Sequence, residues 1–141
     1  MKKINIQSIP VILGTLLYGI CLLFEAYYIG IEREPQYAFF ALILGWVGLF
    51  GGYYYWLANP LFIVSLLLYK KRLASVVFGI LSFTLAFLFL NLDKVIANEA
   101  GMYEPIVGYG VGYYLWLLAM FVYTAGQFCI MCISKETEKI T

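Results

Sequence analysis

Few side chains of this 141-residue chain could do chemistry, and the sequence contains no histidine. The chain therefore lacks the commonest zinc ligand, the usual proximal haem ligand and the usual general base. It also contains no nucleotide-binding motif, no nucleophile-elbow motif and no acidic cluster at metal-ligand spacing. We therefore expect a protein that is not an enzyme and that holds no metal and no cofactor.

Three polar side chains, Glu25, Asn59 and Asn91, fall within or at the ends of long apolar stretches. Polar groups at membrane depth are costly and mark functional sites by default. The helices expected below place all three on one side of a membrane, so we predict a small outer-leaflet polar site ringed by tyrosines. The alternative is structural, with Glu25 reaching the interface and Asn59 bonding the backbone that Pro60 leaves unpaired. The candidate site residues are Glu25, Asn59, Asn91, Tyr53, Tyr113 and Tyr114.

A second candidate is the C-x-x-C pair of Cys129 and Cys132, a spacing that redox proteins use. The topology expected below puts this pair near the cytoplasmic end of an apolar helix, where thiols stay reduced and protonated. We expect both, like Cys21, to be buried as small apolar residues. Acylation of the pair is an alternative that the sequence leaves open.

A third candidate is the run Val107-Gly-Tyr-Gly110, which matches part of a potassium-channel selectivity filter. Such a filter needs threonine before the valine and a pore helix ahead of it, whereas this chain has Ile106 and a polar stretch that ends in Pro105. We therefore expect a flexible start to the last helix. An aromatic belt of Tyr113, Tyr114 and Trp116 should follow at the membrane surface.

The elements that position these residues follow from composition. The chain is 64% apolar and 12% charged, whereas soluble domains are about half apolar and a quarter charged. This composition predicts a polytopic membrane protein that forms one domain over residues 1–141. The net charge of +1 and the lack of a basic patch exclude nucleic acid as a partner.

The hydropathy pattern predicts an all-α transmembrane bundle with four net spans. The tract 37–69 is too long for one span and too short for two, because a span needs about 20 residues. We expect 37–52 to be a re-entrant or kinked half-segment hinged at Gly51-Gly52. The alternative is one long helix over 37–57 that breaks at Asn59-Pro60. The expected spans are 9–28, 53–69, 73–90 and 111–133.

Charge sets the expected orientation, because lysine and arginine concentrate on the cytoplasmic side of a membrane. With four net crossings and a cytoplasmic N-terminus, seven of the nine basic residues are cytoplasmic. Only Arg33 and Lys94 are then external. We therefore expect both termini to be cytoplasmic, with Lys70-Lys71-Arg72 on the same side.

Two short runs, Trp56-Leu-Ala-Asn-Pro-Leu61 and Gly112-Tyr-Tyr-Leu-Trp116, resemble a group of small uncharacterised bacterial inner-membrane proteins with about four spans. The resemblance implies a multi-pass location in the bacterial inner membrane and carries no activity. The residues themselves favour a non-enzymatic partner, accessory or immunity-type subunit of another envelope complex. Its partners would be the lipid bilayer and another membrane protein or a second copy. The alternative is a small homo-oligomeric channel or transporter that uses the outer-leaflet polar site.

Overall fold

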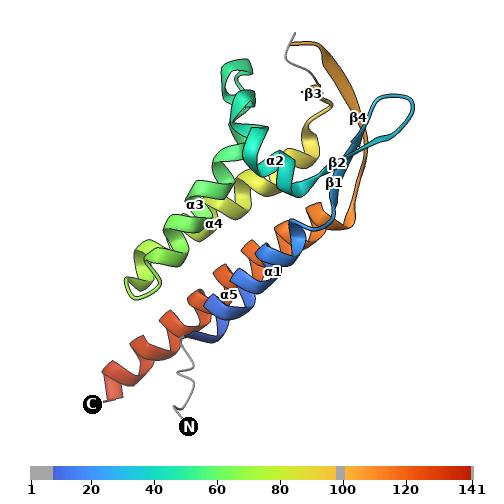
Figure 1. Cartoon of the computed structure of the whole chain (residues 1–141). Helices are drawn as coiled ribbons and strands as arrows, with labels where there is room; N and C mark the ends of the chain where they lie inside the picture. The colour runs from blue at the N-terminus through green and yellow to red at the C-terminus, as the bar shows by residue number, and fades with distance from the viewer. Residues whose placement is uncertain (1–7, 98–100, 141) are drawn as a thin grey trace.

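The computed structural model describes residues 8–97 and 101–140, the last six of them by their backbone alone. Long helices run alongside one another. A small sheet and a short helical arm, formed by Ala38–Gly51, lie at one end of them (Figure 1). The order along the chain is α1 (Ile9–Cys21), β1 (Glu25–Ile29), β2 (Glu34–Tyr37), α2 (Ala38–Leu44), η2 (Gly45–Gly51), η3 (Tyr54–Leu57), α3 (Ala58–Leu67), α4 (Arg72–Leu88), η4 (Phe89–Asn91), β3 (Lys94–Ile96), β4 (Tyr103–Tyr109) and α5 (Val111–Ile140), where η marks a 3₁₀ helix.

The sheet makes the predicted all-α fold class wrong. Its four antiparallel strands have the order β2-β1-β4-β3. The helix expected over 9–28 ends at Cys21, and Tyr27 pairs with Tyr109 across the β1–β4 ladder. Hydropathy cannot separate a short apolar strand from the end of a helix. The tyrosines and isoleucine of β1 favour a strand, and hydrogen bonds to the distant strand β4 complete it.

The prediction of four spans is also wrong. Within the described residues, two helical stretches are long and apolar enough to cross a membrane, Arg72–Asn91 and Val111–Ser134. At 1.5 Å per residue, the 13 residues of α1 extend only about 20 Å, less than a bilayer core of about 30 Å. The stretch Tyr54–Leu67 is also too short.

Within the tract 37–52, Tyr37 ends β2 and the residues after it form α2 and η2. The tract ends at Gly52, whose φ of +80° reverses the chain. A positive φ is strained for any residue with a Cβ, so glycine at this position ends the helical arm. The alternative of one helix over 37–57 is therefore wrong. The second short segment, η3 with α3, begins after this turn and continues through Asn59-Pro60 without a break.

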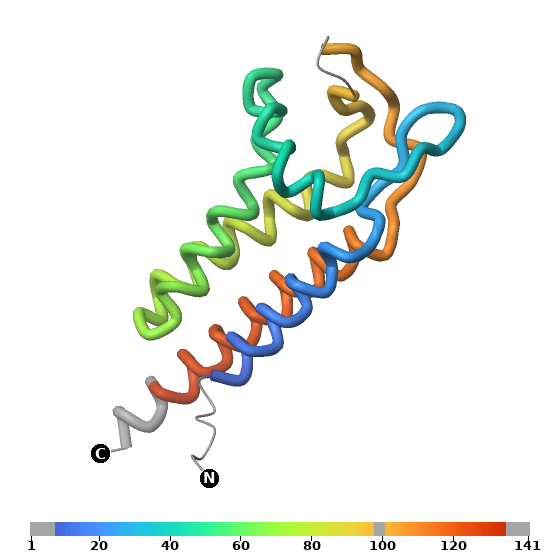
Figure 2. Tube along the Cα trace, in the orientation of Figure 1, coloured from blue at the N-terminus to red at the C-terminus, as the bar shows by residue number. Residues whose placement is uncertain are grey.

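The helices pack in two pairs, α1 against α5 and α3 against α4. The two pairs meet where α4 packs against α5 (Figure 1). Small residues permit the close approach of α1 and α5. A Cβ on Gly14 would lie 2.8 Å from the Tyr123 Cβ, and one on Gly126 would lie 2.6 Å from the Pro10 Cγ. The start of α1 and the turn between α3 and α4 lie at the end opposite the sheet (Figure 2).

The interior of the helix pairs is rich in polar and small side chains. Ser65, Ser75 and Tyr123 form a closed ring of hydrogen bonds across α3, α4 and α5. Ser65 donates to the Ser75 carbonyl (2.7 Å), Ser75 donates to the Tyr123 hydroxyl (2.7 Å), and Tyr123 donates to the Ser65 carbonyl (2.6 Å). Ser82 adds a bond to the Ala58 carbonyl (2.8 Å). Hydrogen bonds therefore hold the three helices together.

Candidate functional site

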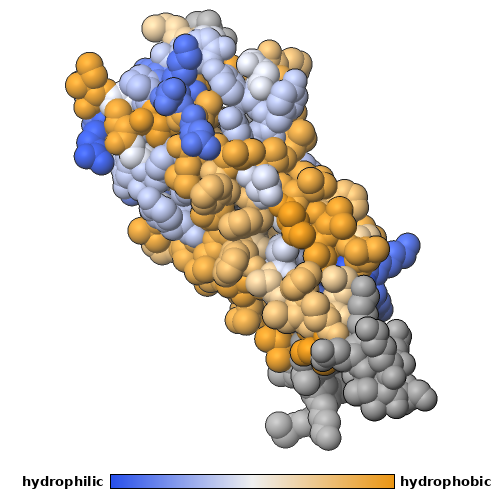
Figure 3. Space-filling view, turned by 180° about the vertical axis from the view of Figure 1, so that it is seen from behind, coloured by the Kyte–Doolittle hydropathy of each residue, from blue (hydrophilic) through white to orange (hydrophobic). Residues whose placement is uncertain are grey.

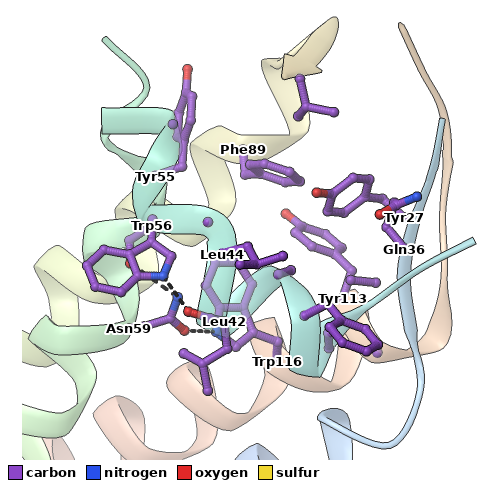
Figure 4. A pocket seen from close by; sticks show the side chains of 18 of the residues that line it. Tyr27, Gln36, Leu42, Leu44, Tyr55, Trp56, Asn59, Phe89, Tyr113 and Trp116 are labelled. Carbon is purple, nitrogen blue, oxygen red and sulfur yellow. Dashed lines mark hydrogen bonds between the residues drawn. The ribbon is translucent and has the colours of Figure 1, made fainter. Parts of the chain in front are cut away.

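A cavity of about 250 Å³ lies where the helices meet the sheet and the helical arm (Figure 4). Its walls come from the end of α1, from strands β1, β2 and β3, from α2 and the 3₁₀ helices η2, η3 and η4, and from the sheet-facing ends of α3 and α5. The side chains that line it are mostly apolar or aromatic. A concave apolar site with a few polar groups is typical of small-molecule binding. This cavity is the candidate site.

Asn59 lies at the cavity and is held by three hydrogen bonds (Figure 4). Its Oδ1 accepts from the Tyr18 hydroxyl (2.9 Å) and from the Trp116 indole N–H (2.9 Å), and its Nδ2 donates to the Trp56 carbonyl (3.1 Å). Trp56 is held in turn by a bond from its Nε1 to the Leu42 carbonyl (2.8 Å). Asn59 thus joins α1, α3, α5 and η3, which is a structural role.

Tyr53 and Tyr113, two of the predicted tyrosines, also line the cavity. Tyr113 is 2% exposed, and its hydroxyl donates to the Ala86 carbonyl of α4 (2.8 Å). The structure thus brings together Asn59, Tyr53 and Tyr113.

Glu25, Asn91 and Tyr114, the other three predicted site residues, do not line the cavity. Glu25 begins β1, where its carboxylate accepts a bond from the Tyr28 hydroxyl (2.7 Å). Because a phenol that donates to a carboxylate holds its proton more tightly, this bond raises the pKa of Tyr28. Asn91 is exposed at the end of η4, and Tyr114 is 56% exposed on the outer face of α5.

Sequence reasoning missed several cavity residues. Gln36 of β2 and Trp56 and Trp116 line the cavity, and Tyr18 supports it through Asn59. Gln36 lies in the polar loop between two predicted spans, so no hydropathy signal pointed to it. The indole and phenol donors of Trp116 and Tyr18 were detectable in principle, because buried tyrosine and tryptophan usually find a hydrogen-bond partner.

The run Val107-Gly-Tyr-Gly110 lies mostly in β4, so the expected flexible start of the last helix is a strand. A Cβ on Gly110 or Gly112 would collide with the backbone carbonyl of Glu25. These glycines therefore permit close packing of β1 against the start of α5. Within the expected aromatic belt, Tyr114 is exposed, whereas Tyr113 and Trp116 turn inward.

The three cysteines are free thiols. Cys21 is buried, as expected, and its Sγ donates to the Tyr18 carbonyl (3.0 Å). Cys129 and Cys132 are exposed on α5, which contradicts the expected burial of the pair. Among the described residues, no group of three or more His, Cys, Asp or Glu side chains could hold a metal ion.

The residues that line the cavity suit reversible binding, because they present aromatic faces and neutral polar groups.

Comparisons with models of protein families, with curated proteins and with solved structures find no match for this chain. The predicted likeness to small bacterial inner-membrane proteins therefore stays a prediction.

Proposed function

We propose that this chain is a small integral membrane protein that works through lateral helix contacts, as a partner, accessory or immunity-type subunit of another envelope complex. On this proposal it is not an enzyme, and the resemblance noted above suggests the bacterial inner membrane. One observation carries the proposal, namely the exposure of large apolar side chains along the helices.

Many large apolar side chains face outward along the helices, and the interior combines serine and alanine side chains with the buried rings of Phe62 and Tyr123. Leu16 of α1, Leu73 of α4 and Phe121 of α5 are 57%, 67% and 53% exposed. In contrast, Ser75 and Ser82 are fully buried. Lipid can cover such a surface, and interhelical hydrogen bonds can stabilise such an interior. Figure 3 shows a mostly hydrophobic body with hydrophilic groups gathered at the sheet end and near the opposite end.

A shallow hollow of about 210 Å³ on the outer face of α4 and α5 could receive a side chain of a neighbouring helix. Its lining includes Ile80, Phe121, Ala125 and Phe128, and the Thr124 hydroxyl lies beneath it without a hydrogen-bond partner within the described chain. A neighbour that fills the hollow would gain apolar contacts. A lateral contact at α4 and α5 is therefore the form of association that the geometry supports best.

The channel or transporter alternative needs Glu25 and Asn59 to share a pathway. Asn59 is engaged by Tyr18, Trp56 and Trp116, and Glu25 does not line the cavity that Asn59 lines. No contact among the described residues favours this alternative.

The test combines carbonate extraction of membranes with co-purification in a mild detergent, followed by mass spectrometry. We expect the protein to stay in the carbonate-washed pellet and to recover one specific membrane protein. Ala125→Phe fills the α4–α5 hollow and should abolish recovery, whereas Glu25→Gln should retain it. Release by carbonate would contradict the proposal. Solute flux in liposomes that Asn59→Ala or Glu25→Gln abolishes would favour the channel instead.

A further inference from the structure

The walls of the cavity are dominated by aromatic rings that already contact one another. Phe89 is central, with ring centroids 5.6 Å from Tyr27, 5.8 Å from Tyr55 and 5.8 Å from Tyr113. Figure 4 shows these rings and Trp116 around the same space. Aromatic rings prefer offset or edge-to-face partners. A flat ring that entered the cavity could therefore extend this cluster.

Two neutral polar side chains at the cavity lack a partner within the described chain. They are the Tyr27 hydroxyl and the Gln36 amide, from residues that pair across strands β1 and β2, and both side chains lie at the cavity (Figure 4). Asn59 also has a second amide hydrogen beyond the one that it donates to Trp56. The cavity thus offers both donors and acceptors to a ligand.

Charge and size narrow the class of ligand. None of the described residues that line the cavity is acidic or basic, and a charged ligand would lose its hydration without gaining an ionic partner. The volume of about 250 Å³ lies just below the usual range of about 300–1,000 Å³ for small-molecule sites. The ligand must therefore be neutral and small, apart from any tail that extends outside.

We propose that this cavity binds a neutral flat ring with hydrogen-bonding substituents, of the aromatic or quinone type. The ring lies against the Phe89 cluster, and its substituents meet Tyr27, Gln36 and Asn59. The site is separate from the outer face of α4 and α5, so binding here does not depend on the proposed lateral contact.

Binding can be measured on the full chain in mild detergent, since Trp56 and Trp116 line the cavity. The probe is 2,3-dimethyl-1,4-naphthoquinone, which is neutral, flat, blocked against addition of thiols and able to quench tryptophan fluorescence. We expect saturable quenching above the partition into micelles. The neutral ring 1-naphthol should displace the probe, whereas anionic 1-naphthoate and flexible 1-decanol should not.

Two variants assign the binding to the cavity. Ala41 lies in its wall on α2, so Ala41→Phe should fill the space and abolish the saturable quenching. The matched control, Ala125→Phe, places the same bulk in the α4–α5 hollow and should leave quenching unchanged. Tyr27→Phe keeps the ring and removes one hydrogen bond, which should weaken binding about fivefold. This variant keeps the test decisive if Ala41→Phe fails to fold.

The proposal is overturned if the intact protein gives no saturable quenching, or if a folded Ala41→Phe variant quenches as the intact protein does. Displacement by 1-decanol as effective as that by 1-naphthol would show an acyl-chain site instead. A decyl-tailed quinone separates the sources of the ligand. If the tailed quinone binds more tightly than the tailless probe that it displaces, the ligand comes from the bilayer. If it binds more weakly, the ligand comes from water.

Discussion

At the scale of single residues, Asn59 links several helices, and a hydropathy pattern cannot reveal such links. Its amide bonds Tyr18, Trp56 and Trp116. Interhelical hydrogen bonds in membranes contribute about 0.6 kcal/mol each. Loss of the two that Asn59 makes to Tyr18 and Trp116 in Asn59→Ala should therefore lower the free energy of unfolding by about 1 kcal/mol. Denaturant titration in mild detergent would measure this change.

The control for that measurement is Asn91→Ala, which changes an exposed asparagine. Exposed substitutions usually alter stability by less than about 0.5 kcal/mol. If both variants were equally stable, the role of Asn59 as a link between helices would be refuted.

Tyr28 and Glu25 form a partly buried pair on β1 with a testable titration. The bond to Glu25 raises the pKa of the Tyr28 phenol above its ordinary value of about 10. The stability that this bond adds is present below the ordinary pKa and is lost as the pH rises through the raised one. Phenolate absorbance, taken as the difference from Tyr28→Phe, should shift to lower pH in Glu25→Gln. An unchanged titration would contradict the bond.

At the scale of elements, the α1–α5 pair continues directly into the β1–β4 pair. The Gly110 N–H donates to the Ala26 carbonyl (2.8 Å) at this junction. A Cβ on Gly112 would lie 2.8 Å from the carbonyl oxygens of Phe24 and Glu25. Because a backbone cannot move aside as a flexible side chain can, Gly112→Ala should destabilise the protein by about 1–3 kcal/mol. Denaturant titration of the variant in mild detergent would test this.

Gly19 on α1 provides the matched control, because a Cβ there meets nothing within 4 Å. Alanine favours a helix over glycine by up to about 1 kcal/mol, so Gly19→Ala should leave stability unchanged or raise it. Loss of stability in both variants would show that replacing a helix glycine by alanine destabilises this protein in general, rather than through a specific contact at the junction.

At the scale of the whole molecule, a charged residue introduced on the exposed apolar helices should weaken membrane association, whereas one introduced at the sheet end should not. Leu81 is 48% exposed on α4, and Ile31 is 98% exposed in the β1–β2 turn. An arginine at the centre of a membrane helix costs about 3 kcal/mol. Leu81→Arg should therefore reduce the carbonate-resistant fraction, whereas Ile31→Arg should not. Equal effects of the two substitutions would contradict the proposed membrane location of the helices.

Part of the candidate site was predictable from composition. Asn59, Tyr53 and Tyr113 stand out because polar and amphipathic residues in an apolar stretch need a partner, and all three line the cavity. Glu25 stands out for the same reason, yet it pairs with Tyr28 on strand β1 of the sheet. The sequence cannot show this, because Glu25 lies beyond the true end of α1.

The sequence by itself determined the apolar character of the helices, the charged turn at Lys70-Lys71-Arg72 and the absence of histidine. These properties depend on residue type alone. Only the tertiary structure decided that residues 25–29 and 103–109 pair as strands and that Gln36 reaches the cavity. The physical reason is that a strand is completed by hydrogen bonds to residues distant in the chain, whereas a helix carries its bonds within its own segment.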